Sequence, residues 1–211
     1  MRLRWWEFGL LWEAVGNLRK VSDWRNMHLA GHYYHIYNRG CNREPIFVDD
    51  ENYLFLLRRA KSFLADYPLN VIAYCLMPNH YHFLVRPEED GASSRFIQRL
   101  FNSYTQAFNK QHKRSGTLFE GRAKSILVDT DEYVLYLCRY IHLNPVRAGL
   151  VAHPGEWPYS NYLEWVEQRN GTLVDREFVR AYFPAPADYE GFVMSGMDPA
   201  MEEKLRVYCL E

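Results

Sequence analysis

Apolar and polar positions along the chain follow strand and helix periods from about residue 31 onward. The segment 32–38, HYYHIYN, is rich in aromatic and β-branched residues and ends at an Arg-Gly pair, which predicts a strand. Apolar residues at helical spacing follow over 51–67, and Asp49 or Asp50 precedes them as the expected N-cap. The chain therefore opens with a strand followed by a helix.

A hairpin and a long helix are predicted next. Residues 70–76 and 80–86 are two short apolar runs separated by a Met-Pro-Asn turn, a pattern typical of paired antiparallel strands. Ser93 or Ser94 then precedes a run to about residue 112 with an apolar stripe at helical spacing, so we expect a serine-capped helix there.

The last part of the pattern completes a recognisable order of elements. Residues 117–128 predict a strand, and Asp129-Thr130-Asp131-Glu132 begins a third helix over about 133–142, which we expect to stop before Pro145. The order β-α-β-β-α-β-α contains the split βαβ arrangement in its first six elements. The predicted fold class is therefore α+β: a ferredoxin-like antiparallel sheet with helices on one face, plus short N- and C-terminal extensions.

Length and composition limit the class of protein. The 211 residues suffice for one sizeable core, and 48% hydrophobic with 16% aromatic residues is a globular composition. No apolar run approaches the roughly 18 residues that a membrane span needs, so no membrane partner is expected. The four cysteines lie far apart without a CxxC pair, which indicates reduced thiols and a cytoplasmic protein. We divide the chain into an N-terminal extension (1–30), one domain (31–165) and a small helical C-terminal extension (166–211).

Charge is unevenly distributed although the net charge is only −1. Residues 91–150 carry a net charge of +5, whereas residues 151–211 carry −6 and residues 1–90 are balanced. A polyanion would therefore bind at the middle of the chain. A solvated helix that happens to be basic explains the same charge equally well.

Two histidines and the third helix carry the candidate chemistry. On a strand, His80 and His82 point to the same face, so their imidazoles form part of a metal site or simply pack and hydrogen-bond. On the helix, Tyr133, Tyr140 and Asn144 follow at spacings of seven and four and lie near one face. An amide oxygen and a phenol one turn apart can meet a cation that a neighbouring strand holds.

Several separated motifs in order resemble one known family. The segment CLMPNHYHFLV (75–85) resembles the His-hydrophobic-His strand of the single-tyrosine transposases, which are HUH endonucleases. The segments SGTLFEGR (115–122) and RYIHLNPVR (139–147) resemble their REP-associated branch. The resemblance runs from about residue 32 to residue 162. It implies that residues 31–165 form a catalytic domain that binds Mg²⁺ or Mn²⁺ and cleaves single-stranded DNA, typically hairpins, through a 5′-phosphotyrosine.

The resemblance also implies roles for particular residues. His80 and His82 match the metal ligands, and Asn144 matches the third ligand, where the broader family often has glutamine. Tyr140 matches the nucleophile because it lies four residues before that ligand, and Tyr133 is the second choice.

Basic residues around these motifs are expected to hold DNA phosphates. They follow the first strand, lie in the fourth strand region or flank the tyrosine: Arg39, Arg43, Arg122, Lys124, Arg139 and Arg147. We expect single-stranded or hairpin DNA as the partner, no nucleotide cofactor, and a monomer or weak dimer.

Two other functions fit parts of the pattern. A metallohydrolase could use the same histidine pair to activate water, and it would turn over without a covalent adduct. A non-enzymatic single-stranded nucleic-acid-binding module could use the same fold, and its binding would be indifferent to metal.

Overall fold

The computed structural model describes residues 28–196 and 199–205. Its centre is a four-stranded sheet made of β1 (Tyr33–Arg39), β2 (Leu69–Met77), β3 (His80–Pro87) and β4 (Lys124–Val128). The strand order is β2-β3-β1-β4 and every neighbouring pair is antiparallel. This is the predicted ferredoxin-like arrangement. The expected strand over 117–128 shortens to β4, with Phe119 adding only an isolated bridge to Gly40.

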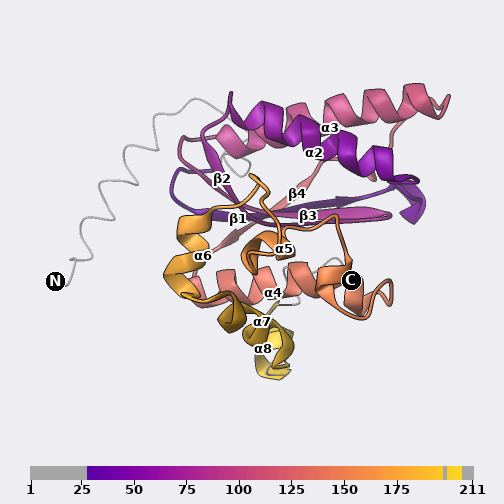
Figure 1. Ribbon diagram of the computed structural model, residues 1–211. Helices are drawn as coiled ribbons and strands as arrows, with labels where there is room; N and C mark the ends of the chain where they lie inside the picture. The colour runs from indigo at the N-terminus through magenta and orange to yellow at the C-terminus, as the bar shows by residue number, and fades with distance from the viewer. Residues whose placement is uncertain (1–27, 197–198, 206–211) are drawn as a thin grey trace.

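Helices cover both faces of the sheet (Figure 1). The helices of the split βαβ motif, α2 (Asp50–Leu64) and α3 (Ala92–Gln111), lie on one face as expected. The next helix, α4 (Asp131–Arg147), follows the split βαβ motif and lies on the opposite face of the sheet. Both faces of the sheet are covered because strands β2 and β3 carry apolar side chains on both sides, and these side chains must be buried under helices.

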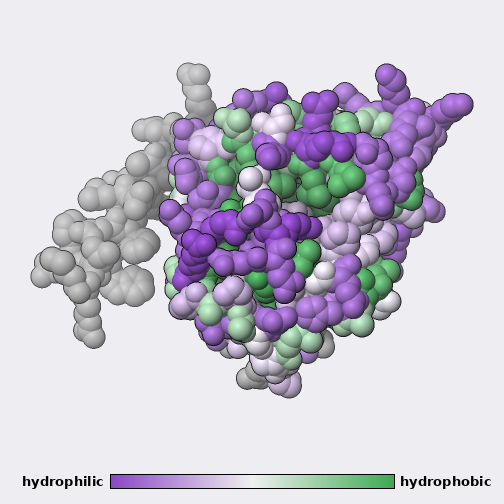
Figure 2. All heavy atoms as spheres, in the orientation of Figure 1, coloured by the Kyte–Doolittle hydropathy of each residue, from purple (hydrophilic) through white to green (hydrophobic). Residues whose placement is uncertain are grey.

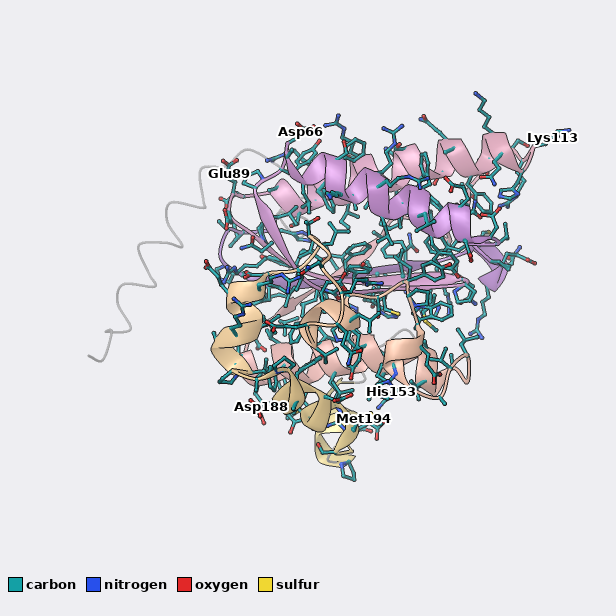
Figure 3. The ribbon with its side chains drawn as sticks, in the orientation of Figure 1. Asp66, Glu89, Lys113, His153, Asp188 and Met194 are labelled. Atoms are coloured by element: carbon teal, nitrogen blue, oxygen red, sulfur yellow. The ribbon has the colours of Figure 1, made fainter. Side chains whose placement is uncertain are left out.

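The two faces of the sheet belong to two separate cores. Residues of β3 alternate between them: Phe83 packs with α2 and α3, whereas Leu84 packs with α4. Side chains fill the space between the sheet and each helical layer (Figure 3). The visible outer surface is largely hydrophilic, with apolar side chains showing mainly in hollows between the layers (Figure 2).

Helix starts and stops agree with the expectations at two sites and differ at two. Asp49 caps α2 by accepting from Asn52 N, and Thr130 caps α4 by accepting from Tyr133 N. The serine cap expected for α3 is wrong: Gly91, in the left-handed region at φ 73°, occupies the N-cap, and Ser93 bonds to His28 instead.

The third helix also continues past its expected end. α4 includes Pro145 and ends at Arg147, whereas we expected it to stop before the proline. Asn144 and Pro145 are both buried, and the turn closes with hydrogen bonds from Ala148 N to Asn144 O and from Leu150 N to Pro145 O. Tertiary packing thus outweighs the local penalty of the proline.

The C-terminal segment adds short helices to the α4 side. They are η3 (Pro154–Glu156), α5 (Tyr162–Trp165), α6 (Arg176–Tyr182), α7 (Pro186–Met194) and α8 (Pro199–Leu205). Helices α7 and α8 contact α4, and Phe178, Tyr189 and Met201 join the second core. The segment around Ser160, between η3 and α5, runs along the free edge of β2. There Leu76 N donates to Tyr159 O, and Asn161 N donates to Tyr74 O. This edge is therefore protected from pairing with another chain.

No helix in the described ranges is long and apolar enough to cross a membrane. Cys41, Cys75 and Cys138 are free thiols, as expected, and the last cysteine lies outside the described residues. Most of the predicted N-terminal extension, residues 1–27, also lies outside them.

His28 predicts a pH dependence of stability. Its Nδ1 lies 2.6 Å from Ser93 Oγ, its Nε2 lies 2.7 Å from Ser125 Oγ, and its ring stacks on Tyr34. Burial lowers the pKa of His28 from 6.5 to about 4. Between these values the unfolded chain binds more protons than the folded one, so stability falls as pH falls through this window. The loss attributable to His28 reaches about 3 kcal/mol at pH 4.

Urea unfolding at several pH values checks this expectation. The free energy of unfolding of His28→Gln should fall less between neutral pH and pH 4 than that of the unaltered protein. His32→Gln, at an exposed histidine nearby, serves as the control and should behave like the unaltered protein. Parallel pH profiles for all three proteins would contradict the assignment.

Candidate active site

The site is built where the start of β3 meets the last turns of α4. Because side chains alternate along a strand, His80 and His82 face α4 while Tyr81, between them, packs into the core beneath α3. Asn144, on α4, reaches both imidazoles: its Oδ1 lies 3.4 Å from His80 Nε2, and its Nδ2 lies 3.5 Å from His82 Nε2. The structure thus brings together the three predicted metal ligands.

The proton of His80 is placed by its neighbour in the hairpin turn. His80 Nδ1 lies 2.7 Å from Asn79 Oδ1, and an amide oxygen only accepts, so Nδ1 carries the proton. Burial lowers the pKa of His80, the hydrogen bond that only the protonated ring can donate to Asn144 Oδ1 opposes this shift, and the charge of Arg39 adds to it. A neutral His80 therefore turns an unprotonated Nε2 toward Asn144.

His82 is completely buried and has a histidine neighbour of its own. Its Nδ1 lies 2.9 Å from Nε2 of His35 on β1. Burial holds the pKa of His82 well below its ordinary value, and the nearby His35 and His80 lower it further. A neutral His82 that donates Nδ1–H to His35 presents the lone pair of Nε2 to the same point as His80.

The residues fit a divalent cation. Two neutral imidazoles with unprotonated Nε2 atoms face one amide group, whose oxygen lies beside His80; imidazole nitrogens and an amide oxygen are a donor set that first-row divalent metals accept. Within the described residues no group of three or more His, Cys, Asp or Glu side chains is placed to hold a metal. The site therefore depends on the Asn144 amide for its third donor.

Tyr140 lies against the histidines. Its ring packs edge-on against His82 with centroids 5.7 Å apart, and the guanidinium of Arg147 lies 5.4 Å from the centre of the Tyr140 ring. Tyr140 is 4% exposed, so its hydroxyl lies among protein groups. Tyr133 is half-buried and begins two turns earlier, about 10 Å back along the helix axis. Of the two predicted tyrosines, Tyr140 is thus the one at the level of the predicted ligands.

The predicted phosphate-binding residues divide into three situations. Arg43, Arg122 and Lys124 are exposed. Arg39 pairs with Glu120 at 2.6 Å, and Arg147 pairs with Glu202 of α8 at 3.1 Å.

Arg139 is 2% exposed, with its guanidinium over the Phe192 ring of α7 and its pKa lowered by burial. In this conformation, its side chain faces the second core and not the solvent.

Sequence reasoning missed two residues of this site. His35 belongs to a strand interpreted only as aromatic, and Asn79 to a segment interpreted only as a turn. The period of two on β1 would have placed His35 on one face with Tyr37, but the face and register against β3 come only from strand pairing.

His35 is expected to support metal binding by fixing the orientation and tautomer of His82. His35→Phe keeps the ring but removes the acceptor, so we expect the affinity for Mn²⁺ to fall roughly 10- to 100-fold. Electron paramagnetic resonance of free Mn²⁺ during titration measures this affinity without any DNA. The exposed His32 offers the matched control His32→Phe. Equal affinities in the two variants would rule out the supporting role.

Comparisons with known proteins agree with this geometry. The family model described as "Transposase IS200 like" matches residues 28–144, more than half of the chain. A protein of Haemophilus influenzae named as a REP-associated tyrosine transposase is 28% identical, over 52% of this chain and 76% of that relative.

Two solved structures are similar in fold. One, a REP-associated tyrosine transposase bound to a REP hairpin, has a TM-score of 0.58 at 19% identity, covering 70% of this chain and 90% of that one. Another, a transposase from Deinococcus radiodurans, has a TM-score of 0.39 at 18% identity over 52% of this chain and 87% of that one, too low to carry an argument. The family match, which spans the β1 strand, both histidines, Tyr140 and Asn144, shows that the chain belongs to the IS200-like transposases and is a DNA strand-transferring enzyme.

Proposed function

We propose that this transposase cleaves and rejoins single-stranded DNA beside a hairpin through a covalent bond to Tyr140. One observation carries the proposal: Tyr140 packs against His82 while Asn144, one turn further along α4, faces both His80 and His82. Nucleophile and cation site therefore lie side by side. The similar solved structure that holds a REP hairpin supports hairpin DNA as the substrate.

The covalent step balances without a further reactant. The Tyr140 oxygen attacks phosphorus in line and forms a new P–O bond while the bond to the 3′ oxygen breaks. The phenol loses its proton and the departing 3′ oxygen gains one, leaving a 5′-phosphotyrosine and a free 3′-hydroxyl. The phosphotyrosine keeps the energy of the broken ester, so rejoining needs no nucleotide cofactor.

Residues around Tyr140 have defined tasks in this scheme. The positive charge of Arg147 beside the ring favours the phenolate that forms on attack. His80, His82 and Asn144 would hold Mg²⁺ or Mn²⁺, which when bound supplies Lewis-acid stabilisation of the phosphate charge. Arg43, Arg122 and Lys124, which are exposed, position the DNA backbone. Because Tyr140 is buried, the scissile phosphate reaches it only after Arg147 or other covering side chains move.

We further propose that the enzyme acts in the cytoplasm as a monomer or weak dimer. The free thiols and the protected β2 edge support this, since that edge offers no unpaired backbone to a second copy.

A labelled hairpin with single-stranded flanks tests the proposal. The DNA is incubated with the protein and Mn²⁺, Mg²⁺ or a chelator, then run on a denaturing gel. A 5′-phosphotyrosine predicts that a 3′-end label moves with the protein, while a 5′-end label is released on a fragment with a 3′-hydroxyl.

Three other outcomes would each contradict part of the proposal. Release of both labels without an adduct would favour the metallohydrolase, and tight metal-independent binding without cleavage would favour a binding module. Retention of the 5′ label on the protein would reverse the proposed polarity.

A further inference from the structure

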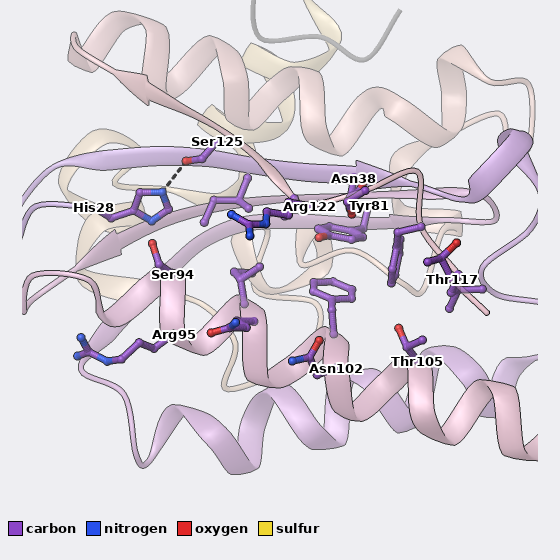
Figure 4. A pocket seen from close by; sticks show the side chains of 18 residues that line it. His28, Asn38, Tyr81, Ser94, Arg95, Asn102, Thr105, Thr117, Arg122 and Ser125 are labelled. Carbon is purple, nitrogen blue, oxygen red and sulfur yellow. Dashed lines mark hydrogen bonds between the residues drawn. The ribbon is translucent and has the colours of Figure 1, made fainter. Parts of the chain in front are cut away.

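A cavity lies on the face of the sheet opposite His80 and His82. It has a volume of about 720 Å³ and opens between α3 and the segment that leads into β4 (Figure 4). One wall consists of α3 side chains spaced three, four and three residues apart, which places them on one helix face: Arg95, Gln98, Asn102 and Thr105. We call this cavity the α3 groove.

The opposite wall comes from β1 and from residues 117–125. Asn38 fixes the bend in this wall, since its side chain donates to Gly121 O and accepts from Arg39 N, both at 2.9 Å. The neighbouring Arg122 and Thr117 are exposed and line the groove. Polar groups therefore face each other across it.

The floor of the groove is aromatic. Tyr81 and Phe101 stack with ring centroids 3.8 Å apart, and Phe119 meets both edge-on. Tyr81 and Phe101 are buried, so the partly exposed Phe119 is the ring that a flat heterocycle can contact while it hydrogen-bonds at its edge to the polar walls. Gln98 and Asn102 are exposed, and neither side chain makes a hydrogen bond among residues 28–196 and 199–205. Their donors and acceptors remain available to such a ligand.

The charge of the groove indicates an anionic ligand. Among the described residues that line it, the charged side chains are Arg95 and Arg122, and no carboxylate faces it. His28, at one end, is buried and hydrogen-bonded to Ser125. Most of the residues that line the groove come from the stretch 91–150, whose net charge is +5. Nucleobases attached to phosphates combine both of these properties.

A smaller hollow adjoins the α3 groove near the end of β1. This hollow, of about 110 Å³, shares Asn38, Gly121 and Arg122 with the groove and adds Arg39, Glu120 and Lys124. Arg39 lies directly opposite His80 in the β1–β3 register and pairs with Glu120, the one carboxylate among the described residues that line this hollow. Basic side chains thus follow one path around the end of the sheet.

We infer that the α3 groove binds unpaired bases of the single-stranded DNA that adjoins the cleavage point. This inference rests on the proposed function and adds a base-binding site on the other face of the sheet. The strand runs from the active site past Arg39, Lys124 and Arg122 into the groove. There its bases contact Phe119 and hydrogen-bond with Gln98 and Asn102.

Fluorescence anisotropy on the full chain tests the inference with two probes. One is a labelled DNA hairpin, and the other is the same hairpin with a tail of about eight thymidines. The gain in affinity that the tail provides should fall roughly tenfold in Gln98→Ala/Asn102→Ala, because base contacts are lost. Asn102→Trp, which fills the groove, should remove the gain altogether. The affinity for the hairpin without a tail should stay the same.

Matched controls lie on the outer helices. Gln106→Ala changes the same residue type on an exposed part of α3 outside the groove, and Lys61→Ala removes an exposed charge from α2. Both variants should keep the full gain in affinity that the tail provides. Arg122→Ala should weaken tail binding regardless of tail sequence and reduce its dependence on salt.

The outcomes separate this inference from the proposed function. If the unaltered protein forms the covalent adduct but the tail gain survives Asn102→Trp, the groove does not bind DNA and the proposed function stands. If the tail gain disappears in the groove variants but no adduct forms, the groove stands and the proposed function fails. A hairpin that binds equally with and without its tail would overturn the groove assignment.

Discussion

Tyr140→Phe is expected to lower formation of the covalent protein–DNA adduct by at least about a thousandfold, since no other group replaces the attacking oxygen. The substitution removes one atom and keeps the ring that packs against His82 and beneath Arg147. Folding and hairpin binding should therefore survive. The measurement is the rate of adduct formation in Mn²⁺ with a 3′-labelled hairpin, together with binding of the same hairpin by anisotropy.

Tyr133→Phe is the matched control for this prediction. Tyr133 lies two turns earlier on α4, so its loss should leave the rate within about threefold, the size of an indirect effect. An adduct that persists in Tyr140→Phe and disappears in Tyr133→Phe would place the nucleophile two turns back. Activity that survives both substitutions would exclude a tyrosine of this helix and favour attack by water.

Asn161→Ala is expected to destabilise the protein by about 3–4 kcal/mol, the largest effect on stability that we predict from a single side chain. Asn161 is completely buried, and its amide donates to Ile72 O and Leu173 O. Its oxygen accepts from Tyr74 N at 2.8 Å and from His142 Nε2 at 2.9 Å. One amide thus joins the β2 edge, the C-terminal segment and α4.

The network around Asn161 extends to α7. Because His142 Nε2 donates to the amide oxygen, its Nδ1 is left to accept from the Tyr189 hydroxyl. Removing Asn161 therefore leaves buried polar groups unpaired on three elements, which costs more than the hydrogen bonds alone.

Urea unfolding measures this loss. Asn161→Leu, which keeps the side-chain volume, should lose nearly as much as Asn161→Ala, because unpaired groups and not a cavity dominate the loss. Asn170→Ala, at an exposed asparagine nine residues further on, should change stability by less than about 0.5 kcal/mol. A loss below about 1 kcal/mol in both Asn161 variants would contradict the network's role.

Local patterns were sufficient for most of the elements. Period-two runs located β1, the β2–β3 hairpin and their turn, and helical spacing located α2, α3 and α4. Predictions failed where a distant residue decides the local conformation. Ser93 does not cap α3 because His28 takes its hydroxyl, and α4 passes Pro145 because packing buries that turn.

The candidate site follows the same division. The alternation of a strand determines that His80 and His82 share a face, and the helix period determines that Tyr140 and Asn144 share another. That these two faces meet depends on α4 crossing beneath β3, on the side opposite α2 and α3.

The sequence by itself therefore determined which side chains could act together: the histidine pair of one strand, the tyrosine and amide of one helix, and a basic middle segment. Only the tertiary structure decided which of them meet. It joined His35 to His82, separated Tyr133 from the ligands, buried Arg139 beneath α7 and formed the α3 groove between segments far apart in the chain. The physical reason is that alternation and helical spacing are properties of neighbours in the chain. Strand register and the choice of face are settled by burying apolar surface on both sides of the sheet at once.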